Sequence, residues 1–298
     1  MIKNSRINAF MSIVIYLGII ACILFAMTVI PNNFSNIKKE TVDYEKKFEG
    51  VKKEFLDKYG INLITYSEEL PELNGMSFEW VKVDERLINS IELLEKALSK
   101  LPDNMIKSEL KYDAIIKTMK NDMDIYLVTN MYDDELELGG TTLSTVADRD
   151  VIFIDVYARN VEYNLYHEIF HVIEMKGIGD FAILFNKVFS GSRWYSYNPQ
   201  EFDYGDEKKY DYIEFLKGDV EDIYFVTSYS KKSISEDMAE IFAAMMTYEE
   251  DDVPYSFYSP HVIDKMRFIS EFLEENYESA TEDAHWNRWL NSLEESEN

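Results

Sequence analysis

The stretch NLYHEIFHVIEMKG, residues 164–177, places two of the chain's four histidines four positions apart, with a glutamate directly after the first. On an α-helix, residues four apart project from the same face, so His167 and His171 can direct their imidazoles at one point. Two such histidines are two of the ligands that a catalytic zinc ion takes. Glu168 lies close enough to hold a water molecule beside the ion, which is the arrangement of metal-assisted hydrolysis in the H-E-x-x-H motif.

The alternative interpretation is an amphipathic helix whose histidines are ordinary surface or core residues. In a random arrangement of this composition the motif would occur on the order of 0.01 times, so a coincidental match is improbable. The stretch also follows an apolar segment and ends at Gly177, as helices commonly do. These observations favour the metal site.

The third ligand decides the class of peptidase, because catalytic zinc sites usually take three protein ligands. The metzincin pattern requires glycine at 174 and histidine at 177, but this chain has Glu174 and Gly177. The next glutamate comes too late for the short spacer of a thermolysin-like site. Asp180 lies just past the predicted helix end and fits poorly. His261 and His285 are far along the chain, where we expect them to be surface or packing residues.

A stronger source of the third ligand is the segment FVTSYSKKSISEDMAEIFAAMM, residues 225–246. Glu236 and Glu240 lie four apart on one face of a predicted helix. One carboxylate can bind zinc, while the other accepts the second ring N–H of a ligating histidine and fixes its tautomer. The spacing of Ser233 and Glu236 also fits a capping box, in which Glu236 would serve only its own helix N-terminus. Spacing alone leaves both interpretations open and does not say which glutamate is the ligand.

These motifs together resemble those of a known family. In YHEIFHVIE, the second histidine, His171, is separated from Glu236 by 64 residues. Tyr229 lies seven positions before Glu236, and EDMAEIFA begins at Glu236. This pattern resembles the anthrax lethal factor-like zinc peptidases, of gluzincin type, which include bacterial Pro-Pro endopeptidases. RWYSYNPQEFDY, YFVTSYS and EDMAEIFAAMM also resemble uncharacterised, membrane-attached proteins of low-GC Gram-positive bacteria that are thought to be zinc metallopeptidases. The resemblance covers about residues 85–250.

The resemblance implies a zincin-like α+β fold, in which a small sheet packs against the H-E-x-x-H helix, and one zinc ion as cofactor. The roles that it implies are zinc ligand (His167, His171 and Glu236), general base (Glu168), stabilisation of the transition state (Tyr229) and orientation of His167 (Glu240). EDM replaces the aromatic pair that follows the glutamate in lethal factor. The long N-terminal region also has no counterpart in the toxin, so the substrate preference is not carried over.

The N-terminal region predicts attachment to a membrane. Ala9–Ile30 is 22 residues long without a charged side chain, enough to cross a bilayer as a helix. Lys3 and Arg6 precede it, which favours a cytoplasmic N-terminus and an extracellular remainder. Cys22, the one cysteine, follows GIIA, which resembles a lipobox, but the apolar residues that continue past it favour an uncleaved anchor. Either alternative tethers the domain to the outer face of the membrane.

Composition limits the class of partner. The formal net charge of −26 argues against a nucleic-acid partner, because a phosphate-binding surface requires clustered lysine and arginine. An apolar content of 46% is sufficient for a buried core. Since no cysteine lies beyond the anchor, we expect a domain without disulfides. The expected partners are therefore the membrane and a peptide or protein substrate.

Three parts are expected along the chain: an anchor or signal segment (1–31), a charged helical stalk and lead-in (32–83), and a zincin-like domain (84–298). Hydrophobic periodicity predicts helices over 32–58, 84–100, 104–119, 164–177, 235–248 and 259–277. A short strand followed by a loop is expected after Gly60, and two further strands at 124–132 and 150–157, with the turn-like ELGG between them. Residues 177–225 are expected to form a long loop region with one short helix.

The sequence thus predicts a membrane-tethered, extracellular zinc endopeptidase in which a glutamate activates water. One alternative is a catalytically inactive, zinc-containing surface module that binds a peptide or a cell-wall partner. Another is an anchored structural protein without a metal.

Overall fold

The computed structural model describes residues 43–70, 73, 75–102, 105–106, 123–133, 136–146, 149–177, 193–205 and 219–297. Of these, the residues within Tyr44–Asn298 belong to one compact unit. The anchor predicted at Ala9–Ile30, with Cys22, and the helix predicted at 104–119 lie outside the described residues, as does Asp180. Within the described ranges, no helix has the length and apolar character that crossing a membrane requires.

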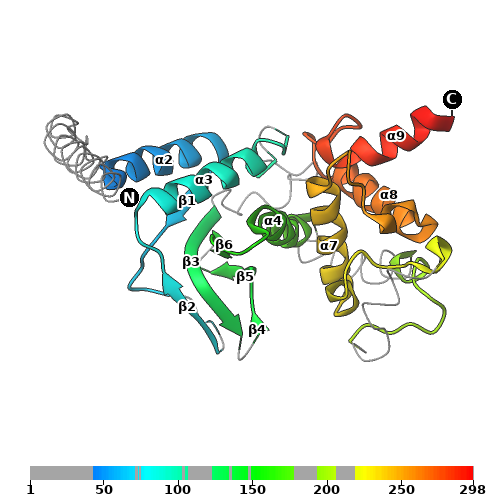
Figure 1. The fold of residues 1–298 in the computed structure, drawn as a ribbon, viewed down its shortest axis with the longest axis horizontal. Coiled ribbons are helices and arrows are strands. Elements are labelled where there is room, and N and C mark those ends of the chain that lie inside the picture. The colour runs from blue at the N-terminus through cyan, green and yellow to red at the C-terminus, as the bar shows by residue number, and fades with distance from the viewer. Residues whose placement is uncertain are drawn as a thin grey trace, which may run out of the picture. The chain divides into compact units, whose positions relative to one another are not determined.

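Helices and strands alternate in the first half of the unit, and helices follow in the second (Figure 1). The longer helices are α2 (Tyr44–Tyr59), α3 (Glu85–Leu98), α4 (Val161–Gly177), α7 (Ile234–Thr247), α8 (Pro260–Asn276) and α9 (Arg288–Glu297). The strands are β1 (Ile61–Ile64), β2 (Met76–Trp80), β3 (Met123–Asp133), β4 (Leu136–Glu137), β5 (Gly140–Val146) and β6 (Arg149–Asp155). The 3₁₀ turns are η1 (Val220–Asp222), η2 (Tyr229–Lys231), η3 (Tyr255–Tyr258) and η4 (His285–Asn287).

The strands form a mixed sheet in the order β1-β3-β6-β5. β1, β3 and β6 run parallel, β5 pairs antiparallel with β6, and β2 and β4 pair with the distal half of β3. The central segments of β3 and β6, residues 125–128 and 151–154, are apolar and buried on both faces, as expected of central strands. On one face, Tyr126 of β3 stacks on Phe153 of β6 with ring centroids 4.5 Å apart. The other face packs on the helices.

α4 lies between the sheet and α7, with β5 and β6 on one side of it (Figure 1). Apolar side chains of α4 are fully buried in the core that the sheet shares with α3, α7 and α8: Leu165, Tyr166, Ile169 and Phe170. Because α4 is packed on both sides, its position is fixed by the core. The small sheet against the H-E-x-x-H helix is confirmed, and the strands and helices agree with a mixed fold.

The ends of several helices follow from local sequence. Gly60 ends α2 with a positive φ of 70°, and its N–H bonds Leu56 O at 3.0 Å. Asp84 caps α3, because its side chain accepts a hydrogen bond from Leu87 N at 3.1 Å. Pro260 occupies the first turn of α8, where its missing N–H costs nothing. The predicted helices at 84–100, 164–177, 235–248 and 259–277 are confirmed, as is the described part of 32–58.

The structure differs from the prediction around ELGG. The turn is shorter than expected, because Glu137 belongs to β4 and Gly140 begins β5. β5 was not predicted, since its sequence GTTLSTV is small and polar and resembles a loop. β2 was not predicted either.

The boundary expected at residue 84 lies inside the compact unit, because β1 and β2 belong to the same sheet as β3.

Candidate metal centre

α4 directs its polar residues to two different neighbours. Asn164 and Glu168 face strand β5. The residues that face α7 and the segment before it are Tyr163, His167, His171 and Glu174. His167 and Glu168 lie among the apolar residues of the helix and are buried, with 7% and 6% of their surface exposed. Buried polar groups of this kind need partners, and both residues have them.

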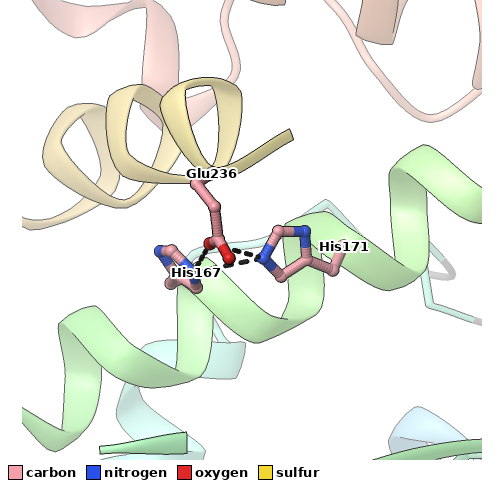
Figure 2. Close-up of side chains that lie close together, drawn as sticks. All are labelled: His167, His171 and Glu236. Carbon is pink, nitrogen blue, oxygen red and sulfur yellow. Dashed lines mark hydrogen bonds and ion pairs between the residues drawn. The ribbon is translucent and has the colours of Figure 1, made fainter. Parts of the chain in front are cut away.

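α7 supplies Glu236 from its first turn (Figure 2). Ser233 is the N-cap, and its hydroxyl accepts a hydrogen bond from the backbone N of Glu236 at 3.1 Å. The Glu236 carboxylate points away from its own helix toward the two histidines of α4. Only half of the predicted capping box therefore forms: the backbone of Glu236 is capped, while its side chain joins the histidines.

Three ligand atoms converge on one point. Glu236 Oε2 lies 3.0 Å from His167 Nε2 and 3.2 Å from His171 Nε2, and the two nitrogens are 3.1 Å apart. Bonds of 2.0–2.1 Å in tetrahedral geometry would separate ligand atoms by about 3.3 Å, so this triangle is close to the size that zinc requires. In the part of the chain that the structure describes, these residues form the one group of histidine, cysteine and acidic side chains able to hold a metal.

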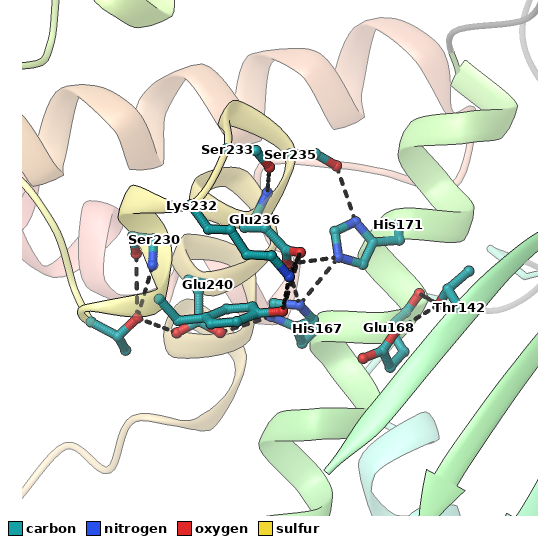
Figure 3. A network of polar contacts seen from close by, with 12 residues as sticks. Thr142, His167, Glu168, His171, Ser230, Lys232, Ser233, Ser235, Glu236 and Glu240 are labelled. Carbon is teal, nitrogen blue, oxygen red and sulfur yellow. Dashed lines mark hydrogen bonds and ion pairs between the residues drawn. The ribbon is translucent and has the colours of Figure 1, made fainter. Parts of the chain in front are cut away.

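Each histidine has a second partner at its other ring nitrogen (Figure 3). His167 Nδ1 lies 2.8 Å from Glu240 Oε1, a short contact that is poorly aligned for a linear hydrogen bond. Glu240 is held in turn by the Tyr163 hydroxyl at 2.9 Å and by the Thr227 hydroxyl. His171 Nδ1 lies 3.1 Å from the hydroxyl of Ser235.

The electrostatics of the centre are those of a cation site. If both Nδ1 atoms carry the ring protons, two nitrogen lone pairs and a carboxylate oxygen face one another, which is repulsive without a positive charge among them. Burial alone would lower the pKa of the histidines, but the carboxylates around them raise it to about 10 for His167 and about 9 for His171. Burial alone would raise the pKa of Glu236, but the two histidines hold it well below its usual range. A proton or a metal ion satisfies this arrangement.

Glu168 flanks the centre on the side of strand β5, which supports its carboxylate. Thr142 donates a hydrogen bond to Glu168 Oε2 at 2.7 Å. A Cβ at Gly140 would lie 2.8 Å from Glu168 Cγ, and one at Gly139 would lie 1.9 Å from the Asn164 side chain. The two glycines of ELGG thus allow the strand to approach α4 closely. Burial raises the pKa of Glu168, which makes the carboxylate a better base.

Tyr229 borders the same centre from the turn before α7. Its hydroxyl lies 3.2 Å from Glu236 Oε1, and its ring centroid is 5.8 Å from that of His167. Lys232, which the sequence did not single out, places Nζ 2.9 Å from the Tyr229 hydroxyl and 3.4 Å from Glu236 Oε1. Burial raises the pKa of Tyr229, and the ammonium of Lys232 opposes that shift. The tyrosine is 37% exposed, so its hydroxyl is accessible at the edge of the centre.

The structure brings together all six residues that the sequence predicted for the site, and it leaves the other two histidines outside. His261 stacks on Tyr224, with ring centroids 4.0 Å apart. His285 lies in η4, where burial lowers its pKa to about 4. Residues that the prediction missed contact the six: Thr142, Tyr163, Glu174, Thr227, Lys232 and Ser235. Of these, only Thr142 had a nearby signal, the glycine pair that precedes it.

Comparison with known proteins gives one distant likeness. No model of a known protein family matches the sequence, and no curated protein matches it. A crystal structure described as a putative zinc-binding metallo-peptidase from Bacteroides caccae ATCC 43185 is 14% identical, with a TM-score of 0.48. The match covers 87% of this chain and 97% of that chain.

Proposed function

We propose that this chain is a zinc-dependent endopeptidase that hydrolyses peptide bonds. The observation that carries the proposal is the convergence of His167 Nε2, His171 Nε2 and Glu236 Oε2 at 3.0–3.2 Å, with a buried glutamate next to the first ligand. Two histidines and one glutamate are a donor set of catalytic zinc, which leaves a coordination position for water or substrate. In the proposed fold, which is zincin-like, α4 holds two of the three ligands, and α7 holds the third.

The residues of the chain then have distinct roles. His167, His171 and Glu236 would hold the zinc ion, which would supply the Lewis acidity for activation of water and polarisation of the scissile carbonyl. Glu168 accepts the proton of the attacking water and passes it to the leaving amine, with Thr142 holding its carboxylate in place. Tyr229 donates its hydroxyl hydrogen to the oxyanion that develops on the substrate. Glu240 orients His167 through the contact at 2.8 Å.

Strand β5 would supply a track for an extended peptide. Among the described strands, β5 pairs only with β6, so no described strand lies along its other edge beside Glu168. An extended peptide can add to such an edge through main-chain hydrogen bonds. This position would bring a peptide bond alongside the general base, which fits a peptide or protein substrate.

The proposed location is the outer face of the cell membrane. Ala9–Ile30 would span the bilayer as a single helix, or Cys22 would carry a lipid, and Lys3 and Arg6 would remain on the cytoplasmic side. We expect no nucleic-acid partner, because the net charge of the chain is −26.

The test compares wild-type full-length protein in detergent with Glu168→Gln. Metal content is measured by elemental mass spectrometry, and hydrolysis is measured with a peptide library. We expect one zinc per chain in both proteins and hydrolysis only in the wild type. Wild-type protein that binds no zinc would refute the proposal. Equal hydrolysis by Glu168→Gln would refute the role of the base, and zinc binding without any hydrolysis would indicate an inactive binding module.

A further inference from the structure

Ser235 contacts His171 from the neighbouring helix (Figure 3), and Glu174 contacts Ser235 in turn. The Ser235 hydroxyl lies 3.1 Å from His171 Nδ1 and donates to Glu174 Oε2 at 2.5 Å. Glu174 follows His171 by one helical turn of α4, whereas Ser235 comes from the first turn of α7, directly before Glu236. The hydroxyl thus bridges a histidine and a carboxylate of one helix from the neighbouring helix.

The direction of the hydrogen bonds follows from the chemistry of the end groups. An ionised carboxylate only accepts, so the Ser235 hydrogen must point at Glu174. The 2.5 Å separation is typical of a hydroxyl that donates to a carboxylate. The Ser235 oxygen is then left to accept, and the group facing it must be a donor. His171 Nδ1 therefore carries a ring proton, and in the metal-bound protein Nε2 would present its lone pair to the ion that it shares with Glu236 and His167.

Glu174 reaches His171 only through the serine. Its Oε2 lies 3.8 Å from His171 Nδ1, which is too long for a hydrogen bond. It also lies at the Nδ1 edge of the ring, whereas the converging ligand atoms are at the Nε2 edge. Glu174 is therefore placed to support the histidine and not to act as a fourth ligand.

We propose that Ser235 and Glu174 are positioning residues, which act as a hydroxyl–carboxylate relay that fixes the tautomer and ring orientation of His171 as a metal ligand. This inference rests on the proposed zinc site. The two histidines are then supported differently: His167 by the carboxylate of Glu240 directly, and His171 by a carboxylate acting through a hydroxyl. Because the relay crosses from α4 to α7, it also holds together the two helices that supply the ligands.

The experiment measures zinc affinity of the full-length protein by competition with a chromophoric chelator. Ser235→Ala and Glu174→Met should each weaken zinc binding by about 10–100-fold, the usual effect of losing a partner of a ligating histidine. The double variant should be no weaker than the worse single variant, because either change interrupts the same relay. Ser235→Thr, which keeps the hydroxyl, should restore affinity to within a few-fold of the wild type.

Ser233→Ala is the matched control, because Ser233 lies in the same turn and caps α7 without contacting His171. It should lower the thermal stability of the metal-free protein and leave zinc affinity nearly unchanged. In the zinc-loaded wild type, the ¹⁵N chemical shifts of His171 should show a protonated Nδ1 and an Nε2 without a proton.

Several outcomes overturn the inference. These are wild-type affinity in Ser235→Ala, an equal loss of affinity in Ser233→Ala, additive losses in the double variant, or a His171 proton on Nε2. If the wild type binds zinc and hydrolyses peptides while the relay variants are unchanged, the relay is wrong and the proposed function stands. If the wild type binds no zinc, both are wrong.

Discussion

Asp237→Asn is expected to lower the free energy of unfolding by about 3–5 kcal/mol, although it removes no ligand and changes few atoms. Asp237 follows Glu236 in α7 and is fully buried against Lys265 of α8, with Nζ to Oδ2 at 2.6 Å. Burial raises the pKa of the aspartate and lowers that of the lysine, so each charge is tolerated only because the other is present. The substitution leaves the ammonium buried without a counter-charge.

The geometry also predicts what a second substitution does. Asp237 Oδ2 accepts hydrogen bonds from Trp194 Nε1 at 2.9 Å and from the Tyr204 hydroxyl at 2.7 Å, while Lys265 Nζ donates to Tyr224 O at 2.8 Å. Lys265→Met alone should cost a similar amount, since an unpaired carboxylate remains in the core. The combination of Asp237→Asn and Lys265→Met should cost clearly less than the sum of the two single changes, because both charges are removed together.

The assay is urea unfolding followed by circular dichroism in saturating zinc. Asp264→Asn in α8 is the control, because its pair with Arg267 at 3.4 Å is about half exposed and should contribute less than about 1 kcal/mol. A cost below about 1 kcal/mol for Asp237→Asn, or strict additivity in the double variant, would refute the reasoning.

Three further outcomes are expected. Gly140→Ala should lower kcat by about 100-fold with zinc content unchanged, because the new Cβ displaces Glu168, whereas Gly50→Ala, with nothing within 4 Å, should have no effect on kcat. Lys232→Met should lower kcat and leave zinc affinity unchanged. The loss in kcat should be smaller than the roughly 100-fold that follows removal of a direct donor, because the ammonium of Lys232 acts through Tyr229. The metal-free protein should lose stability to urea as the pH rises from about 6.5 to 10, because the folded state raises the pKa of the two ligand histidines to about 10 and 9. The stabilisation that the two protonated histidines contribute is fully present below pH 6.5. Saturating zinc replaces their protons and should abolish the loss of stability at higher pH.

Local sequence was sufficient for the part of the site that lies on one helix. The spacing of His167 and His171 places both rings on one face of α4, and that geometry depends on helical periodicity alone. Glu236 lies 65 positions after His171, and its spacing to Ser233 fitted a cap as well as a ligand. In the structure, Ser233 caps the backbone N–H of Glu236, and the carboxylate of Glu236 faces the histidines.

The supporting residues could not be predicted, because their roles exist only across packed elements. Ser235 and Glu174 meet at the contact between α4 and α7. Lys232 is one of 30 basic residues, and nothing in its neighbourhood distinguishes it. β5 was missed because small polar residues form its sequence, although Gly139 and Gly140 signal a close approach of backbone to another element.

The ligand set joins residues 171 and 236, and therefore closes a long loop of the chain. The described unit lies beyond the single cysteine at position 22, so it has no disulfide to do this. For a loop of about this length, a cross-link would remove roughly 4 kcal/mol of chain entropy from the unfolded state. A bound ion would thus act as a reversible cross-link. After chelation of the ion, proteases should make their first cut in the polypeptide between α4 and α7.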